Sequence, residues 1–367
     1  MINRIEEKIN VLIVDDSAVV RGMLTRAIET DQSIAVAATA MHGDAALRAL
    51  RKTPVDVVIL DVEMPVMDGL TALPLILQEF PDVRVIMASA LTREGAAVTV
   101  KALALGAAGC IPKPNANSMG ESIQQLVVEL VPLIKALGSH KSSSTTPAAV
   151  DRNNDPVPAP PPATRRMGTL AVPPAVVVIG TSTGGPNALS KVLSELPPDF
   201  STPILIVQHM PPLFTPMLAK HLQMDGKRPC QEATHGGLIE RGHTYVAPGD
   251  YHMLIDQHEN RMVTLLNQDP PEHYCRPSVN PLFRSAAKWH GNRVLAVMLT
   301  GMGDDGIEGT RDIAKRSGQI IAQDEASSVV WGMPGAVARE KLADYVLPLD
   351  HVATMIQRLC SPEYSLL

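Results

Sequence analysis

The sequence predicts two α/β domains, each built on a doubly wound, mostly parallel sheet. Short apolar runs rich in β-branched residues alternate with amphipathic runs, and this alternation occurs in both halves of the 367-residue chain. A stretch rich in proline and serine separates the two halves. Alternating strands and helices are typical of parallel sheets covered by helices, and the length suits two domains.

The first half contains five predicted strands joined by helices. Helical patterns cover residues 18–30 and 43–52, between the first strands. The strands are expected at 11–15, 34–38, 55–61, 83–89 and 108–112. We therefore expect a (βα)5 domain over residues 9–130.

The segment 131–170 is interpreted as the end of a helix followed by a linker. Residues 138–170 contain almost no large apolar side chain, so they cannot bury enough surface to offset the entropy cost of ordering. The run "PVPAPPP" favours an extended, semi-stiff chain.

The second domain is expected over residues 171–364. Its strands are predicted at 175–179, 204–208, 294–299 and 319–323, with helices between them. Residues 229–265 carry Gly-Gly and Gly-Asp turns between short strands, which indicates an antiparallel excursion from the main sheet.

Composition restricts the class of protein. The net charge of −6 argues against a general nucleic-acid binder, which usually carries a basic stripe. The four cysteines form no CxxC pair, so a disulfide framework or structural zinc is not expected, and a reducing cytosol fits best. No run approaches the ~20 apolar residues that span a bilayer, and "MINRIEEKIN" has no signal-peptide core. We expect a cytoplasmic protein without membrane insertion.

Polar side chains follow the strands of the first domain. Asp15 and Asp16 end the first strand, Asp61 the third and Ser89 the fourth, and Lys113 follows the fifth. The carboxyl ends of parallel strands meet at one edge of a sheet. Three carboxylates gathered there repel one another unless a hard cation such as Mg²⁺ neutralises them, and a lysine with a hydroxyl can hold a phosphoryl group on one carboxylate.

Two simpler roles remain open for these acids. Asp16 and Ser17 can cap the first helix, and Asp61 can be a turn residue. Only the joint placement of all five residues at strand ends favours the phosphoryl site.

The first domain resembles a response-regulator receiver domain in "VDDS", "DVEMPVMDG", "MASALT" and the "KP" that begins at Lys113. The resemblance implies that Asp61 is the phosphoacceptor and that Ser89 and Lys113 contact the phosphoryl group. It also implies a Mg²⁺ site formed by Asp15, Asp16, Asp61 and the main-chain carbonyl of Glu63, with Asp15 acting through water. Cys110 departs from the pattern, because many receivers carry an aromatic residue there.

Ser182 lies in a glycine-rich turn of the second domain. The sequence "IGTSTGG" places it after an apolar run and before a helical pattern, with the G-x-S-x-G spacing of a nucleophile elbow. The alternative is that Ser182 or Thr183 caps the following helix.

Two further groups are expected at the same edge. His209 ends the strand "PILIVQHM", and Asp304 and Asp305 lie in the loop after "RVLAVM". A serine, a histidine and an aspartate from three strand ends can form a catalytic triad, and main-chain N–H groups in glycine loops can bind an oxyanion.

A dinucleotide site is the competing interpretation of this loop. Gly301, Gly303 and Gly306 have G-x-G-x-x-G spacing, and Asp324 follows about twenty residues later. However, Asp304 and Asp305 would then oppose a bound pyrophosphate.

The second domain is similar to the catalytic domain of the CheB family of chemotaxis protein-glutamate methylesterases. The similarity lies in "IGTSTGGP", "IVQHMPPLFT", "YVAPGDYHM", "RPSVNPLFRSAA", "LTGMGDDG" and "IAQDEASSVVWGMPGAV". It implies that Ser182 is the nucleophile, His209 the base, Asp305 the orienting acid and the N–H of Met302 an oxyanion donor. Asp304 and Asn280 depart from the Asn and Asp that are usual at these positions.

The resemblance implies a phosphorylation-regulated enzyme that demethylates glutamate methyl esters, and deamidates glutamines, on methyl-accepting chemoreceptors. A chemotaxis histidine kinase would be the phosphodonor. Ester hydrolysis would need no cofactor, and Mg²⁺ would serve only phosphorylation. The unphosphorylated receiver is expected to cover the esterase site. The alternatives are a non-catalytic interaction module or a transcription regulator under receiver control.

Overall fold

A computed structural model describes residues 8–90, 92–113, 119–138 and 173–361. Nearly all of the predicted linker therefore lies outside the described residues. Within the described part of the chain, no helix has the length and apolar character needed to cross a membrane.

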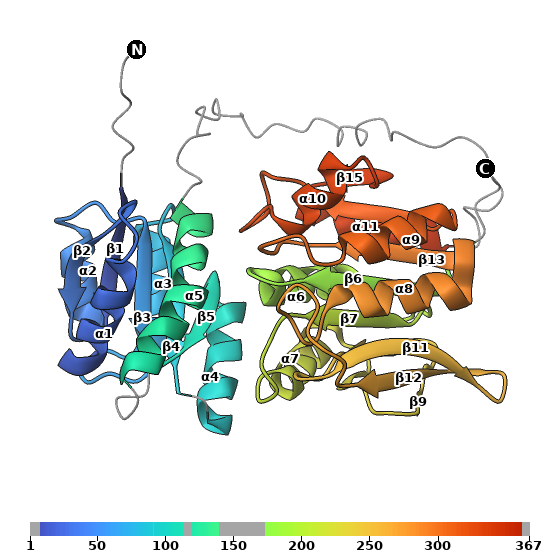
Figure 1. The fold of residues 1–367 in the computed structure, drawn as a ribbon, viewed down its shortest axis with the longest axis horizontal. Coiled ribbons are helices and arrows are strands. Elements are labelled where there is room, and N and C mark those ends of the chain that lie inside the picture. Colours follow the sequence, from blue (N-terminus) through green and yellow to red (C-terminus); the bar gives the residue numbers. More distant parts are fainter. Residues whose placement is uncertain (1–7, 91, 114–118, 139–172, 362–367) are drawn as a thin grey trace, which may run out of the picture.

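The first domain is a five-stranded parallel sheet in the order β2-β1-β3-β4-β5 (Figure 1). Its strands are β1 (Ile9–Val14), β2 (Ile34–Ala40), β3 (Val57–Asp61), β4 (Arg84–Ser89) and β5 (Gly109–Pro112). The helices are α1 (Ala18–Ile28), α2 (Gly43–Leu50), α3 (Gly69–Glu79), α4 (Arg93–Ala104) and α5 (Met119–Gly138). Apolar residues of α1 and α5 share one buried cluster, and those of α2, α3 and α4 contribute to another on the opposite face. The expected doubly wound fold is confirmed.

Local sequence explains where these helices begin. The side chains of Ser17, Asp68 and Thr92 accept hydrogen bonds from main-chain N–H groups in the first turns of α1, α3 and α4. Such side chains satisfy donors that have no partner inside the helix. Ser17 therefore does cap α1, as the simpler interpretation of that motif expects.

The second domain contains a seven-stranded parallel sheet in the order β15-β14-β13-β6-β7-β10-β8. Its strands are β6 (Val176–Thr181), β7 (Ile204–Gln208), β8 (Cys230–Glu232), β10 (Thr244–Val246), β13 (Val294–Met298), β14 (Gln319–Gln323) and β15 (Tyr345–Leu347). One face packs on α6 (Gly185–Glu195), α7 (Thr215–Gly226) and α11 (Leu349–Cys360). The other packs on α8 (Val279–His290), α9 (Ile307–Lys315) and α10 (Met333–Arg339). A short 3-10 helix, η3 (Gly291–Arg293), follows α8.

The antiparallel excursion is smaller than the sequence indicated. β9 (Gly237–Leu238), β11 (His252–His258) and β12 (Arg261–Asn267) form an antiparallel sheet in the order β11-β12-β9. In contrast, β8 and β10 are parallel members of the main sheet, so the assignment of all of 229–265 to the excursion is wrong. Strands of three residues carry too little alternation to reveal which sheet they join.

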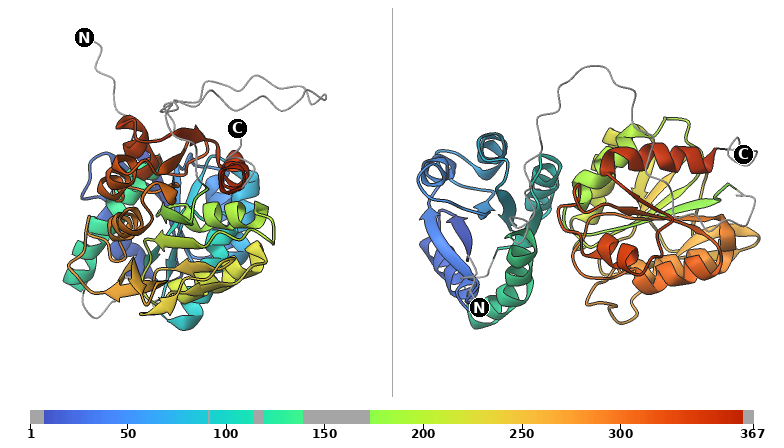
Figure 2. Two further views of the ribbon diagram at one scale, coloured as in Figure 1. Left: turned by 90° about the vertical axis from the view of Figure 1, so that its right-hand side faces the viewer. Right: turned by 90° about the horizontal axis from the view of Figure 1, so that it is seen from above.

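The first domain faces the second with α4, α5 and β5 (Figure 1), and the view from above shows α5 beside the second domain as well (Figure 2). Helix α4 contacts α6 and α7. Val330 of the second domain is buried within the apolar cluster formed by α1 and α5. The buried apolar residues of the two domains are thus continuous across their interface.

Candidate active site

Three adjacent strands bring the proposed catalytic residues together. Ser182 follows β6, His209 follows β7 and Asp305 lies in the loop after β13, and β6 pairs with both β7 and β13. From β6 the chain first adds strands on the β7 side of the sheet and later adds β13, β14 and β15 on the other side, so the strand order reverses at β6. Ligands of open α/β sheets bind at such a point, beyond the carboxyl ends of the strands.

The turn that carries Ser182 is held by main-chain bonds. Its N–H donates to Thr300 O (3.0 Å), and Gly184 adopts φ 78°, which a glycine tolerates without strain. Helix α6 begins at Gly185, and its N-cap is Gly184 with no side-chain hydrogen bond. The alternative that Ser182 or Thr183 caps this helix is therefore wrong.

Gln208 joins the turns of Ser182 and His209, and sequence reasoning did not single it out. Its Nε2 donates to Ser182 O (2.9 Å) and to His209 O (3.2 Å), and the residue is buried. A Cβ at Gly185 would lie 2.0 Å from Gln208 Oε1, so glycine is required there. The only signal in the sequence was the place of Gln208 directly before His209.

His209, which is partly buried, pairs with the buried Asp305. His209 Nε2 lies 2.7 Å from Asp305 Oδ2. Asp305 is only 2% exposed and also accepts from Ser278 Oγ (2.7 Å) and the Val279 N–H (2.7 Å). These groups were missed because Ser278 and Val279 are far from Asp305 in sequence.

In the pair of His209 and Asp305, each residue shifts the pKa of the other toward the charged form. Burial raises the pKa of Asp305, but the bonds from His209, Val279 and Ser278 outweigh burial and lower that pKa below its ordinary value. Burial lowers the pKa of His209, whereas Asp305 and Cys275 raise it to about 10. In this conformation the Asp305 carboxylate therefore favours the protonated form of the His209 ring.

Because His209 Nε2 pairs with Asp305, Nδ1 is the ring nitrogen that is left to exchange a proton with other groups in the site. Cys275 Sγ lies 3.5 Å from this Nδ1. The hydroxyl of Ser182 forms no hydrogen bond within the described residues, but Ser182 and His209 line the same cavity of about 640 Å³. The structure thus brings Ser182 and His209 to one cavity without the bond that a working triad needs.

The first domain covers this cavity. Cys110, Val128, Glu129 and Leu133 of the first domain line it together with residues of the second. The N–H of Gly184 donates to Ala108 O (3.0 Å), which ties the Ser182 turn to the residue before β5. His209 therefore lies in a cavity that both domains enclose.

Met302 and Asp304 also line the cavity. The N–H groups of Ser182 and Gly301 donate to Thr300 O and Val330 O, so both are engaged. Asp304 does not contact His209: its Oδ1 lies 2.9 Å from His273 Nδ1. The unusual charge of Asp304 is thus paired with His273.

A neighbouring contact explains Asn280. His273 Nε2 lies 3.1 Å from Glu308 Oε2, which also accepts from Asn280 Nδ2 (2.7 Å). Asn280 Oδ1 accepts from the Gly309 N–H (2.9 Å). An amide can donate and accept here, whereas a carboxylate would face Glu308 with like charge.

The acidic pocket of the first domain is assembled as expected. Ligand atoms of Asp15, Asp16 and Asp61 all lie within 4.8 Å of one another. Lys113 Nζ is 2.6 Å from Asp61 Oδ2 and 3.7 Å from Asp15 Oδ2. Burial raises the pKa of Asp61 to about 6, with Lys113 opposing the rise and Asp15 adding to it.

The donor set of this pocket fits Mg²⁺. Asp15 Oδ2 is buried without a hydrogen-bond partner, and burial raises the pKa of Asp15. Hard carboxylate oxygens are the ligands that Mg²⁺ prefers. Asp15, Asp16 and Asp61 supply such oxygens.

One residue of the predicted phosphoryl site, Ser89, is placed differently. Ser89 Oγ donates to the Gly95 carbonyl (3.2 Å) on α4, so its hydroxyl is engaged away from the carboxylates. The N–H of Glu63 lies 3.3 Å from Asp61 Oδ1. Ser89 therefore has to turn before it can contact a phosphoryl group on Asp61.

The loop 301–306 is not arranged for a dinucleotide. The Asp305 carboxylate is buried among donors of its own domain. Asp324 accepts from the N–H (3.0 Å) and Oγ (2.6 Å) of Ser327, which closes a local turn. Asp305 and Asp324 thus both have partners within the fold. A pyrophosphate bound in the loop would also meet the negative charges of Asp304 and Asp305.

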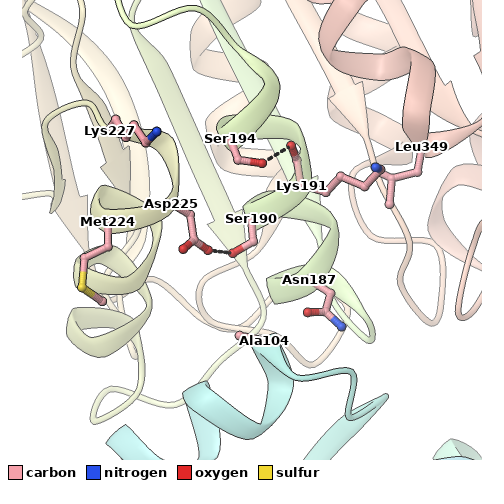
Figure 3. Close-up of a pocket in the computed structure, with 9 residues that line it drawn as sticks. All are labelled: Ala104, Asn187, Ser190, Lys191, Ser194, Met224, Asp225, Lys227 and Leu349. Carbon is pink, nitrogen blue, oxygen red and sulfur yellow. Dashed lines mark hydrogen bonds between the residues drawn. The ribbon is translucent and has the colours of Figure 1, made fainter. Parts of the chain in front are cut away.

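A second cavity of about 710 Å³ lies between α6, α7 and the end of α4 (Figure 3). Ser190 there donates to Asp225, and Ser194 donates to the carbonyl of Lys191. A carboxylate, not an imidazole, thus faces the Ser190 hydroxyl. Among the described residues this cavity lacks the serine and histidine combination of the first.

Comparisons with known proteins agree with this geometry. A family model described as CheB methylesterase matches residues 177–356, and one described as response regulator receiver domain matches 11–124. A protein-glutamate methylesterase/protein-glutamine glutaminase of Azospirillum brasilense is 46% identical, over 97% of this chain and 93% of its own length. One from Caulobacter vibrioides is 50% identical, over 94% of this chain and 97% of its own.

A solved structure supports the assignment of the second domain. The catalytic domain of Thermotoga maritima CheB methylesterase is 38% identical, with a TM-score of 0.50, and the match covers 51% of this chain and all of that domain. The CheB methylesterase family match over residues 177–356 covers the domain that contains Ser182, His209 and Asp305. The chain therefore belongs to the CheB methylesterase family and carries a response regulator receiver domain before its methylesterase domain.

Proposed function

We propose that this chain hydrolyses glutamate methyl esters on methyl-accepting chemoreceptors, and deamidates glutamines, through an acyl-enzyme on Ser182. The observation that carries the proposal is the convergence of Ser182, His209 and Asp305 from three adjacent strand ends, with the 2.7 Å pair between His209 and Asp305. The names of the relatives support the same substrate class.

The reaction follows from the two nitrogens of His209. Asp305 holds a proton on Nε2, so a neutral imidazole offers Nδ1 as the acceptor. Nδ1 takes the proton of Ser182 as Oγ attacks the ester carbonyl. The tetrahedral intermediate expels methoxide, which leaves as methanol with the proton from Nδ1. Water then attacks the acyl-enzyme by the same route and releases glutamate; with a glutamine, ammonia leaves instead.

Met302 is the proposed oxyanion donor. The two N–H groups on either side, of Ser182 and Gly301, are engaged in main-chain bonds. The Met302 N–H follows them at the cavity wall, and one such donor is worth ~3 kcal/mol of the barrier.

The receiver domain is proposed to regulate this site. A chemotaxis histidine kinase would supply the phosphoryl group to an Asp61 carboxylate oxygen, which forms an acyl phosphate. Asp15, Asp16, Asp61 and the Glu63 carbonyl would bind Mg²⁺, which supplies neutralising charge during transfer. Lys113 and a rotated Ser89 would then contact the phosphoryl oxygens.

A physical route connects the two sites. Turning Ser89 toward a phosphoryl group breaks its bond to Gly95 of α4, and α4 contacts α6 and α7. Phosphorylation would thereby loosen the docked receiver and open the cavity. The two states differ in the receiver interface, which is what a regulatory coupling requires.

The protein is proposed to act in the cytoplasm, without nucleic acid and without inserting into the membrane. The deciding experiment measures methanol release from methyl-labelled chemoreceptor membranes, with and without Mg²⁺ and acetyl phosphate. We expect release that rises with the phosphodonor and is lost in Ser182→Ala. Ser194→Ala is the matched control, because Ser194 lies on α6 and donates only to Lys191 O.

The same assay separates the enzyme from a non-catalytic module. Ser182→Ala should still co-sediment with receptor membranes while it releases no methanol. Turnover that persists in Ser182→Ala would refute the acyl-enzyme, and a wild-type protein that binds without any turnover would favour the module.

A further inference from the structure

A tight turn at the mouth of the cavity has an unusual backbone. The N–H of Glu272 donates to Cys275 O (3.2 Å), and the N–H of Cys275 donates to Glu272 O (2.9 Å). The two central residues, His273 and Tyr274, have φ of 49° and 62°. Two-residue turns with both φ values positive favour Asn, Asp and Gly, and bulky side chains are strained there.

Ion pairs from several elements hold this strained turn in place. Arg284 of α8 binds both carboxylate oxygens of Glu272, and His273 lies between Asp304 and Glu308. Directly after the turn, Arg276 Nη2 donates to Asp250 Oδ1 (2.6 Å). Strain of this kind persists only where the surroundings enforce it, and it gathers at functional sites.

Tyr274 has no structural role that would justify this strain. Its side chain is fully exposed, with a relative exposure of 103%, and it forms no hydrogen bond within the described residues. Tyr245 shows the contrast: it is buried, and its hydroxyl bonds to Glu240 N and Leu238 O. Yet Tyr274 lines the same cavity as Ser182 and His209.

We propose that Tyr274 is a substrate-specificity residue whose ring packs against the receptor segment that carries the glutamyl ester. This inference rests on the proposed function and adds a recognition surface to it. The ester sits at the end of a side chain, so the receptor backbone stays outside the cavity while the ester reaches Ser182. A tyrosine held at the mouth is then placed to contact the residues that flank the glutamate.

A rigid tyrosine is well suited to this contact. Its ring offers a large amphipathic surface with only two side-chain torsions to immobilise. The paired turn has already fixed the backbone, so binding does not have to order the loop. A small ester enters the cavity without a flanking backbone, so it gains nothing from Tyr274.

The test compares two substrates with Tyr274→Ala in the full-length protein. For methylated receptor membranes we expect KM to rise about tenfold, the scale of losing one aromatic contact, with kcat unchanged. For p-nitrophenyl acetate we expect no change in kcat/KM. Tyr274→Phe keeps the ring and should retain the wild-type KM. Tyr251→Ala, at a partly exposed tyrosine outside the described cavity lining, is the matched control.

Thermal unfolding supplies an independent readout. Asn tolerates positive φ, so Tyr274→Asn should raise the Tm while it raises the receptor KM. A tyrosine that only stabilised the fold would give a lower Tm instead. The inference is overturned if Tyr274→Ala leaves the receptor KM unchanged, if small-ester hydrolysis falls in parallel, or if Tyr274→Asn lowers the Tm.

Failure of the proposed function would look different. In that case the wild-type protein would hydrolyse p-nitrophenyl acetate but release no methanol from receptors. A wild-type protein active on both substrates, with Tyr274→Ala equally active on both, would overturn the role of Tyr274 alone.

Discussion

The main-chain N–H of Gly184 donates to the carbonyl of Ala108 across 3.0 Å, and this bond joins the turn that carries Ser182 to the receiver domain. Gly184 lies two residues after Ser182, and Ala108 directly precedes β5. The receiver thus contacts the backbone that positions Ser182 besides lining the cavity. Basal activity should therefore depend on how tightly the receiver is docked.

Charge changes at Val128 test this dependence. Val128 on α5 is 74% exposed and lines the cavity together with Asp304. Val128→Asp places a second negative charge beside Asp304 and should weaken the docking of the receiver. We expect basal methanol release to rise about two- to fivefold, the range of a partly screened charge interaction. Val128→Lys should lower it. Equal effects of both variants would show that packing, not charge, controls docking.

Ser278→Ala should slow turnover by weakening the support of Asp305. Ser278 Oγ donates to Asp305 Oδ1 at 2.7 Å in a fully buried position. Losing a hydrogen bond to a charged group costs about 1.5–3 kcal/mol, so we expect kcat to fall about tenfold or more. Ser285→Ala, at a buried serine within α8, should lower the Tm without lowering kcat. Equal kcat losses in the two variants would contradict the specific role of Ser278.

The basal rate should rise with pH above neutrality. His209 must be neutral to accept a proton, and its pKa is raised to about 10 in the docked state. Asp305→Asn removes the main attraction for the imidazolium and should lower the pKa of His209. The rise of the basal rate with pH should therefore begin at a lower pH. The same variant should lose about 10⁴-fold in kcat, because the imidazole is no longer held in the required tautomer. Measuring the basal rate against pH without phosphodonor checks both effects. If the rise with pH occurred at the same pH in Asp305→Asn as in the wild type, the pairing of His209 with Asp305 would be refuted.

The same pair makes stability depend on pH. The folded pKa of His209 lies above its ordinary value of 6.5. Its stabilising contribution is therefore complete below about pH 6.5 and is lost as the pH rises through about 10. Thermal unfolding of the wild type should show this loss, whereas His209→Gln should not show it. If the stability of the wild type and of His209→Gln declined equally with rising pH, groups other than His209 would be responsible for the loss.

Removing divalent metal should abolish phosphorylation and spare ester hydrolysis. Asp15, Asp16 and Asp61 form the only cluster of potential metal ligands of this kind among the described residues. With EDTA, acetyl phosphate should no longer label Asp61, and basal methanol release should stay at the wild-type level. Asp15→Asn should behave similarly. A basal rate that fell with EDTA would place a metal requirement in the esterase domain.

Much of the fold was predictable because the strands that position the sites are long and apolar. β6, β7 and β13 are fully buried runs; Ser182 and His209 directly follow the first two, and Thr300 follows β13 after Leu299. The same logic located Asp15, Asp61 and Lys113. Glycine spacing, by contrast, allowed a dinucleotide loop that the partners of Asp305 do not support.

The supporting contacts were not predictable from one sequence. Ser278 and Cys275 meet the site residues only through the tertiary fold, as Gln208 meets Ser182, and their local sequence does not reveal these contacts. β8 and β10 were misassigned because three residues carry no clear period. The pairing of Asp304 with His273 likewise depends on a turn whose positive φ values no propensity favours.

The continuous apolar clusters across the domain interface give the switch a dependence on temperature. Separating the receiver from the esterase exposes side chains such as Val330 to water. Hydrophobic attraction weakens on cooling, so the closed state loses part of its advantage in the cold. A cell at low temperature would therefore keep a larger open fraction of this enzyme. Its basal rate of ester hydrolysis would then fall less on cooling than the slowing of the chemical step alone predicts.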